Sequence, residues 1–354
     1  MSVLQLLNPK GRKREHILAI DLGSRTTKAV SLQRKQDTFT LNRFSVTDAP
    51  NYEKGFSSAV LAEHLKSVLQ GLEPKVKLVT LAVGSSEAVL RNTELPLMPV
   101  DEMRQMLKFN TQNYLHQDLP DHVFDCYILP PKQARADQPK GAIAKYKVWV
   151  GAMKQQLLKE FESAVKAAGY VPDQIALSLL GPVNAFELSE GETFNKGVTA
   201  LVDLGFKSSS ISVIADGELV LSRVVELGGD KVTAGLAEAM GITYAEAEGI
   251  KIGMSGEVEA VLQSLLSQLG RELRASIDFF EHQQDRTVSS VYLSGAAARS
   301  DFVVQSLQSD LMVTCKRWNP LAGLQMGLPS QQMTEVEQAA PQLAVVVGAA
   351  MNLF

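Results

Sequence analysis

The stretch ILAIDLGSRTTKAV, from Ile17 to Val30, joins a strand of buried type to a polar turn. Its aliphatic run ends at Asp21, and a glycine follows two residues later, before small and basic residues lead into a second apolar run. A second stretch, TALVDLGFKSSSISVI from Thr199 to Ile214, repeats this order around Asp203. The two aspartates lie about half the chain apart, so the pattern indicates a duplicated domain and not a short repeat.

Composition narrows the class of protein. The chain has 354 residues, more than one typical core, with 45% hydrophobic and 21% charged residues. A net charge of −4 gives no general attraction to nucleic acid. Cys126 and Cys315 lie far apart with no CxxC pair, which argues against a disulfide framework or zinc site and favours a reducing cytoplasm. The longest apolar run, residues 343–351, is far shorter than the ~18 residues that cross a bilayer.

Hydrophobic periodicity predicts two equivalent α/β halves with a segment between them. Strands are expected at 17–21, 27–32 and 38–46, and again at 199–203, 211–214 and 219–224. Helices are expected near 57–72, 154–168 and 255–282. The segment between the copies has its own β-α-β-β-α pattern, with a polar loop, PPKQARADQPKG, that we expect in solvent.

The domain prediction follows from this pattern. We expect a flexible basic leader at 1–14, a first domain at 15–87 and 169–196, an inserted subdomain at 88–168, a second domain at 197–333, and a C-terminal helix at 334–354 that returns toward the first domain. The leader carries Lys10, Arg12, Lys13 and Arg14 and no acid. It either stays solvated or contacts anionic lipid, at about 1 kcal/mol per basic residue.

The two aspartate-glycine turns have the chemistry of a phosphate and metal site. Glycine lets a phosphate approach the backbone, hydroxyls and N–H groups bind its oxygens, and a carboxylate holds Mg²⁺ or its waters. A single turn of this kind is more often an ordinary β-turn, whereas two on equivalent hairpins favour a clamp around a polyphosphate. The predicted phosphate ligands are Gly23, Ser24, Arg25, Thr26, Thr27, Lys28, Gly205, Phe206, Lys207 and Ser208. The predicted metal ligands are Asp21 and Asp203.

Two further stretches fit a nucleoside. VYLSGAAARS, residues 291–300, is a strand running into a small-residue turn against which a base or ribose could lie. In YAEAEGIK, Glu248 and Lys251 are one helical turn apart, a spacing equally typical of a surface salt bridge.

Together these motifs resemble the nucleotide site of the actin-like ATPase superfamily. The runs ELPLMPVDEMRQMLKFNTQNYL, VGAMKQQLLKEFESAVKAAGY and ELRASIDFFEHQ narrow the resemblance to the PilM family of type IV pilus assembly proteins, over residues 15–351. It implies duplicated actin-like (ribonuclease H-like) domains around a nucleotide cleft, an FtsA-type inserted subdomain, and ATP and Mg²⁺ as ligands. It also implies that Glu248, Lys251, Gly295 and Ala296 approach the adenosine.

The sequence departs from the resemblance at two places. Alanines follow Gly295, where the family's adenosine turn is usually rich in Gly-Gly, and a Cβ there can crowd the base. The crossover IALSLLGPVNAF, residues 175–186, lacks the Gln or acid that orients water in hydrolysing members. We therefore assign no catalytic residue and expect slow hydrolysis or none.

The resemblance predicts a cytoplasmic scaffold, peripheral on the inner face of the cytoplasmic membrane, in a type IV pilus or related secretion complex. In the family, the cytoplasmic N-terminal peptide of a single-span protein, PilN, docks in a groove between the first half and the inserted subdomain. The corresponding residues here are Leu97, Met98, Met103, Met106 and Leu107. Core packing is the alternative role for the two Met residues at 103 and 106. Self-association and the particular machine are left open.

Three alternative functions make different demands on the sequence. A small-molecule kinase of the same superfamily needs a catalytic acid beside the γ-phosphate, and no convincing pair is found. An FtsA-like cell-division filament protein ends in an amphipathic helix, whereas this sequence stops at Phe354 directly after LAVVVGAAMNLF. A GspL-like secretion component would continue into a transmembrane helix.

Overall fold

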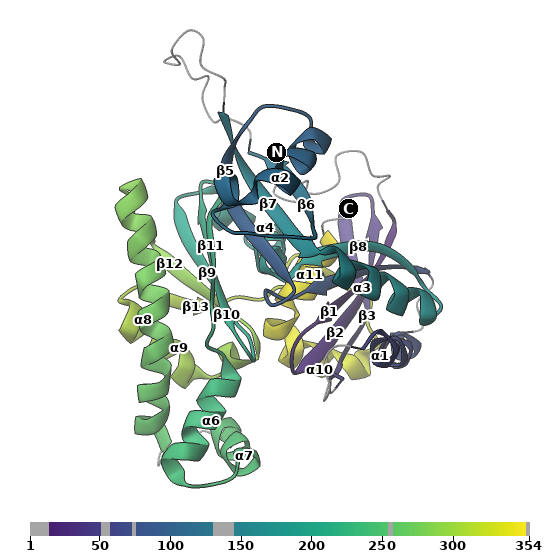
Figure 1. The fold of residues 1–354 in the computed structure, drawn as a ribbon. Helices are drawn as coiled ribbons and strands as arrows, with labels where there is room; N and C mark the ends of the chain where they lie inside the picture. The colour runs from purple at the N-terminus through teal and green to yellow at the C-terminus, as the bar shows by residue number, and fades with distance from the viewer. Residues whose placement is uncertain (1–13, 51–56, 73–75, 130–144, 254–257, 352–354) are drawn as a thin grey trace.

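The computed structural model describes residues 14–50, 57–72, 76–129, 145–253 and 258–351. Two large mixed sheets form two lobes, and a smaller three-stranded sheet lies beside both (Figure 1). The predictions for Lys10, Arg12, Lys13 and the PPKQARADQPKG loop fall outside the described residues.

The first sheet has the strand order β14-β3-β2-β1-β4-β8. Its strands are β1 (His16–Leu22), β2 (Thr26–Lys35), β3 (Thr38–Asp48), β4 (Leu78–Val83), β8 (Val171–Leu177) and β14 (Gln325–Met326). β1 to β3 form an antiparallel meander, and β4 and β8 continue the sheet in parallel from β1. Helices α1 (Ser58–Leu72) and α3 (Gln155–Ala167) pack on it through leucines, valines and alanines.

The second sheet repeats this plan in the order β11-β10-β9-β12-β13. Its strands are β9 (Val198–Leu204), β10 (Ser209–Ala215), β11 (Glu218–Val225), β12 (Ser290–Ser294) and β13 (Cys315–Arg317). The meander of β9 to β11 corresponds to β1 to β3, and β12 pairs in parallel with β9 as β4 does with β1. Asp216 and Gly217, both with positive φ, make the tight turn between β10 and β11. The predicted duplicated α/β fold is confirmed.

Helices α8 (Glu259–Gln284) and α9 (Asp301–Leu311) pack on strands of the second sheet. Helices α6 (Gly229–Met240) and α7 (Tyr244–Gly253) pack on each other, and α6 also packs on α8. Leucines of α8 at steps of three and four are buried against this sheet, as the periodicity predicts. The long helix runs along one edge of the lobe in Figure 1.

The third sheet is the predicted insertion. β5 (Ala88–Pro96), α2 (Val100–Leu115), β6 (His122–Ile128), β7 (Lys145–Lys154) and α3 follow one another in the expected β-α-β-β-α order. The strands pair antiparallel as β5-β7-β6. Alternate residues of β7 face opposite sides. Val148 and Val150 pack with α2 in one core, whereas Trp149 belongs to the core that joins the lobes.

The connections between the lobes are also helical. After β8 come η2 (Ser178–Leu180), α4 (Gly181–Ser189) and α5 (Gly191–Asn195), and the chain ends in η5 (Ser330–Gln332), α10 (Met333–Ala339), η6 (Ala340–Leu343) and α11 (Ala344–Met351). α11 packs against α4 and against β1, β2 and β4 of the first sheet. Phe186 of α4 lies edge-on to Tyr292 and Trp318, with ring centroids 4.8 and 5.1 Å away.

One predicted boundary needs correction. The second domain was expected to run to residue 333, yet β14 pairs with β3 at the edge of the first sheet. Trp318, Leu321 and Leu324, just before β14, are buried in the core that also contains residues of β1 and β2. The chain therefore returns to the first lobe earlier than its sequence indicates. The other boundaries stay predictions.

Candidate functional site

The two aspartate-glycine turns are built alike. A Cβ on Gly23 would lie 2.5 Å from the carbonyl oxygen of Thr26, and one on Gly205 would lie 2.4 Å from that of Ser208. In both turns the clash is with the third residue after the glycine, so each turn is too tight for any side chain there. The geometry of each turn therefore requires its glycine.

A glycine pair that sequence reasoning missed supports the second turn. Gly229 and Asp230 donate backbone hydrogen bonds to the carbonyl oxygens of Gly205 and Phe206, at 3.0 and 2.8 Å. A Cβ on Gly228 would lie 2.4 Å from the Phe206 oxygen. The signal in the sequence is LGGDKV, two glycines between a strand and a helix. They bring the N-terminus of α6 against the turn, and a helix N-terminus favours anions.

Charged side chains of both turns act on one another. The Lys28 ammonium donates to the Asp21 carboxylate at 3.1 Å, and both side chains are largely buried. Asp203 accepts a hydrogen bond from Ser294 at 2.8 Å. Burial raises the pKa of Asp203, the negative charge of Asp21 raises it further, and the Ser294 hydrogen bond and the Lys28 charge oppose the rise. The residues from β1, β2 and β9 therefore form one electrostatic unit.

Arg25 extends from the first turn to the second lobe. Its guanidinium lies 5.1 Å from the centroid of the Phe206 ring and 3.8 Å from the Glu248 carboxylate. Lys207 lies over the same ring, at 5.6 Å, and pairs with Asp230 at 2.7 Å. The predicted phosphate residues of the two turns are thus brought together in space.

The predicted nucleoside residues form a compact polar group. Lys251 lies 2.7 Å from the Glu248 carboxylate and donates to the Thr233 hydroxyl at 2.6 Å. Thr233 in turn donates to Glu248 at 2.5 Å. Burial raises the pKa of Glu248, but hydrogen bonds from Lys251 and Thr233 and the charges of Lys251 and Arg25 outweigh it, so the net shift is downward. The carboxylate stays ionised at neutral pH and accepts hydrogen bonds.

The turn after β12 also requires a glycine, because of its backbone conformation and its close contact with β9. Gly295 has φ of +90°, and a Cβ there would lie 2.3 Å from the Leu204 carbonyl oxygen. Its N–H donates to the Pro341 carbonyl at 2.7 Å. The turn is therefore fixed between β9 and η6, and Ala296 beside it is exposed.

One predicted phosphate residue is corrected by its surroundings. The Thr27 side chain is fully buried, and its hydroxyl lies 2.8 Å from Nε2 of His64 on α1. It faces the helix layer of the first lobe, so its hydroxyl is not available to a phosphate. In the described part of the chain, no cluster of three or more His, Cys, Asp or Glu side chains is placed to hold a metal ion. The metal prediction therefore depends on Asp21 and Asp203 alone.

The predicted partner residues divide into core and surface. Met103 and Leu107 of α2 have 0% exposure and pack on the third sheet, which corrects their assignment, because such side chains cannot contact a peptide. Leu97 is 56% exposed, whereas Met98 and Met106 are partly buried against the same core. The spacing of α2 alone does not separate these roles.

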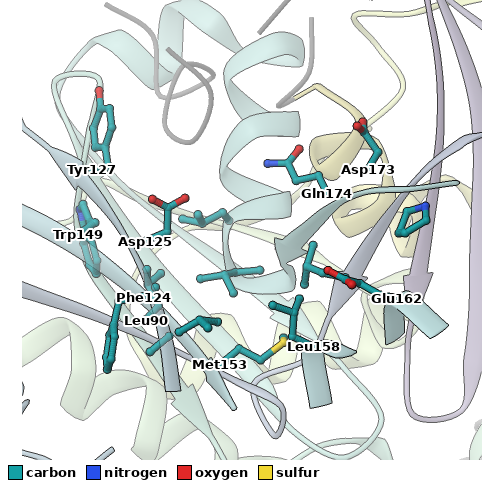
Figure 2. A pocket seen from close by; sticks show the side chains of 17 residues that line it. Leu90, Phe124, Asp125, Tyr127, Trp149, Met153, Leu158, Glu162, Asp173 and Gln174 are labelled. Carbon is teal, nitrogen blue, oxygen red and sulfur yellow. The ribbon is translucent and has the colours of Figure 1, made fainter. Parts of the chain in front are cut away.

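A cavity of about 350 Å³ lies on the opposite side of the third sheet (Figure 2). None of the five predicted partner residues lines it. Side chains from β6, β7, α3 and β8 surround it, so it is bounded by both the inserted subdomain and the first lobe. The apolar lining includes Phe124, Trp149, Met153 and Leu158. Sequence reasoning missed this surface, although KVWVGAM in β7 is apolar on both alternating faces.

The charged residues that line this cavity are all acidic. Asp125, Glu162 and Asp173 come from β6, α3 and β8. Their positions around the apolar lining are visible in Figure 2. We call this pocket with its apolar lining and three acids the acid-lined cavity.

These two repeated sheets, with paired aspartate-glycine turns facing each other, define an actin-like fold. The sequence model of the family "Type IV pilus assembly protein PilM" matches residues 19–354. The chain therefore belongs to the PilM family.

Solved structures agree on the fold. A structure described as the PilM-PilN type IV pilus biogenesis complex is 22% identical, with a TM-score of 0.83 over 97% of this chain and 99% of the other. EutJ, an ethanolamine utilization protein of Carboxydothermus hydrogenoformans, is 15% identical, and its TM-score is 0.55 over 99% of this chain and 93% of EutJ. MreB 5 of Spiroplasma citri, bound to AMPPNP, is 10% identical, and its TM-score is 0.51 over 95% of each chain. No helix in the described residues has the length and apolar character to span a membrane.

Proposed function

We propose that the chain binds ATP with Mg²⁺ between its two turns and acts as a nucleotide-controlled scaffold of a type IV pilus or related secretion complex. The observation that carries the nucleotide site is the electrostatic unit of Asp21, Lys28 and Asp203. Membership of the PilM family and the likeness to a nucleotide-bound actin-like protein support it.

The residues present fit such a ligand. Asp21 lies close enough to Asp203 to raise its pKa. The positive charge of Lys28 opposes this rise but does not cancel it, so a further cation would stabilise the two carboxylates. A Mg²⁺ ion with its waters would supply that charge at Asp21 and Asp203. Backbone N–H groups of the two turns would hold phosphate oxygens, and Glu248 and Lys251 would lie toward the nucleoside.

Turnover is proposed to be slow. The crossover of β8, η2 and α4 carries no Gln or acid from Ile175 to Phe186 to orient an attacking water. The nucleotide would then act as a structural ligand or a switch.

Thermal unfolding with Mg-ATP tests the site. At a hundredfold excess over Kd, ligand binding should stabilise the fold by about 2.7 kcal/mol. Asp203→Ala should abolish this gain and keep the unliganded fold, whereas Asp101→Ala, whose side chain is 89% exposed on α2, should keep both. An unchanged melting temperature of the wild type at millimolar Mg-ATP would exclude the nucleotide site.

We also propose that the acid-lined cavity receives the cytoplasmic N-terminal peptide of a PilN-like membrane protein. The cavity has the size of a small ligand pocket, an apolar lining and a groove position between the first lobe and the inserted subdomain. The family and the PilM-PilN structure support this choice of partner. Docking there would place the chain on the inner face of the membrane through its partner.

Peptide titration separates the cavity from the surface of α2. The probe is the N-terminal cytoplasmic peptide of the PilN-like protein encoded nearby, for which we expect micromolar or tighter binding. Leu158→Glu in the cavity should weaken binding at least tenfold, about 1.4 kcal/mol. Gln155→Glu, exposed on the same helix, is the matched control. Weakening by Met106→Glu alone would place the docking surface on α2 instead.

A further inference from the structure

Lys207, in the second turn, is paired with an acid that the proposed function does not use. Its ammonium donates to Oδ2 of Asp230, the second residue of α6, at 2.7 Å. The same ammonium lies over the Phe206 ring, 5.6 Å from the centroid. Lys207 is a predicted phosphate ligand, whereas Asp230 has no part in the nucleotide site proposed above. The Asp230 carboxylate therefore binds the cation that a phosphate would bind.

Two further hydrogen bonds hold Asp230 against the second turn. Its backbone N–H donates to the Phe206 carbonyl oxygen at 2.8 Å, and its Oδ1 accepts from the Tyr244 hydroxyl of α7 at 2.7 Å. Helices α6 and α7, which carry these groups, pack on each other (Figure 1). Asp230 is thus bound to the turn through its backbone and to α7 through the oxygen that Lys207 does not use.

The charge states of this group follow from the same contacts. The hydrogen bond from Lys207 lowers the pKa of Asp230, burial opposes this effect, and the hydrogen bond from Tyr244 lowers the pKa further. The carboxylate is therefore ionised at neutral pH. Burial and the bond to Asp230 raise the pKa of Tyr244 to about 12, so its hydroxyl keeps the proton that it donates.

Lys207 is the member of this group that can change its partner. Its side chain is 63% exposed, whereas that of Asp230 is 26% exposed and is also held by Tyr244. A lysine ammonium is a point charge on a flexible stem, and an ion pair of this exposure contributes little to stability. The ammonium can therefore leave the carboxylate while Asp230, α6 and α7 stay in place.

The other two cations of the turns have partners of a different kind. Lys28 pairs with Asp21 in a largely buried contact, and the Arg25 guanidinium lies 3.8 Å from the Glu248 carboxylate. In the proposed site, both of these acids face the ligand themselves, Asp21 through Mg²⁺ and Glu248 through the nucleoside. Asp230 instead places a negative charge beside the phosphates, which it repels.

We infer that Asp230 competes with the phosphates of a bound nucleotide for Lys207, and that Tyr244 holds Asp230 in the competing position. The inference rests on the proposed nucleotide site and adds a regulation to it. Binding exchanges the ion pair of Lys207 with Asp230 for a contact of Lys207 with phosphate. The position of α7, which carries Tyr244, then sets how strongly Asp230 competes and so sets the affinity of the site.

Calorimetric titration of the full chain with Mg-ATP tests this exchange. Asp230→Asn keeps the shape of the side chain and removes its charge, so it should tighten binding about fivefold, the upper range for an exposed ion pair. Tyr244→Phe should act in the same direction, by about twofold. Glu238→Gln removes the same charge from an exposed position on α6 and should leave the affinity unchanged. Loss of a purely structural contact would not raise the affinity.

Removal of Lys207 shows whether the two residues act together. In a Lys207→Gln background, Asp230→Asn should change the affinity for Mg-ATP no further, because the competition needs the cation. A persistent effect there overturns the inference, as does a measurable affinity that Asp230→Asn alone leaves unchanged or weakens, and both results leave the nucleotide proposal standing. If neither the wild type nor Asp230→Asn nor Tyr244→Phe binds Mg-ATP, the nucleotide site is contradicted and this inference falls with it.

Discussion

At the scale of single residues, Asp203 is placed where a carboxylate is costly. Its carboxylate accepts a hydrogen bond from the uncharged hydroxyl of Ser294, its register partner on β12. In the first sheet, the residue that pairs with Asp21 in the same way is Ala82. Alanine has no hydroxyl, so Asp21 receives no hydrogen bond equivalent to the one from Ser294. Burial without a cation of its own is what raises the pKa of Asp203.

The pH dependence follows from the direction of this shift. An acid whose folded-state pKa is raised above its ordinary value of 3.8 binds its proton more tightly in the folded protein. Its contribution to stability is therefore present below that value and is lost as pH rises through the folded-state pKa. Asp203→Asn should raise the melting temperature of the ligand-free protein at pH 7, with a gain that shrinks toward pH 4. The same variant should lose stabilisation by Mg-ATP.

Asp21→Asn provides the contrast for that prediction. Asp21 accepts a charged hydrogen bond from Lys28 in a largely buried pair, and its loss should cost roughly 1.5–3 kcal/mol of the free energy of unfolding. Two aspartates at equivalent turn positions should thus have opposite effects on the ligand-free protein. Destabilisation by both substitutions to the same degree would contradict the account of Asp203.

Single residues also show how far the sequence determines local geometry. The aspartates and glycines of the two turns were predictable because a tight turn after a buried strand has few chemical solutions. Thr27 and Met103 were assigned wrongly because one side of a strand or helix is chosen by the partner that packs on it, here His64 and the third sheet. That partner is distant in sequence and leaves no local signal.

At the scale of elements, α4 and α11 cross in unusually close contact. A Cβ on Gly348 would lie 1.7 Å from the Gly181 carbonyl oxygen, and a Cβ on Gly181 would lie 2.6 Å from the Val345 backbone. Asn184 donates to the Gly348 carbonyl at 3.3 Å across the same crossing. The two connecting helices therefore meet backbone to backbone, without side chains between them.

Gly348→Ala should be strongly destabilising for this reason. The methyl group would force α11 away from α4 and from the first sheet, at a cost of at least about 1–3 kcal/mol. Gly71→Ala in α1 is the matched control, because a Cβ there meets nothing within 4 Å and alanine favours helix by about 0.5–1 kcal/mol. Denaturant unfolding of both variants measures the difference. A Gly348→Ala protein as stable as the wild type would mean that the helices slide freely.

Elements differ in how far the sequence determines them. Long periodic segments such as α8, and the paired meanders, were predicted to within a few residues because each carries its own hydrophobic pattern. β14 was not predicted. It has two residues, and its pairing with β3 joins parts of the chain nearly three hundred residues apart. The acid-lined cavity was missed for the same reason, since its walls come from separate elements.

At the scale of the whole molecule, the two lobes are joined in different ways on their two sides. Near the chain crossings, Phe186, Tyr292 and Trp318 make a buried apolar contact between them. At the turns, Arg25 contacts Phe206 and Glu248 of the second lobe, and the charges of Lys28 and Asp21 act on Asp203. Opening of the cleft would therefore break weak polar contacts and leave the apolar side intact.

The magnitude of the Arg25 contacts sets the last prediction. The Arg25 side chain is 46% exposed, so its ion pair with Glu248 contributes at most about 1 kcal/mol, and its contact with Phe206 adds roughly 0.5–1 kcal/mol. A phosphate would bind the same guanidinium through charge-assisted hydrogen bonds, which are about twice as strong as neutral ones. Arg25→Ala should therefore change the melting temperature of the ligand-free protein little.

The same variant should weaken Mg-ATP binding about tenfold and speed amide exchange at residues 205–208. Arg43→Ala, on β3 away from the turns, should alter neither calorimetric affinity nor exchange. If Arg25→Ala instead tightens Mg-ATP binding, Arg25 competes with the nucleotide for Glu248 and holds the cleft shut. Unchanged affinity and exchange would show that Arg25 takes no part in coupling the lobes to the ligand.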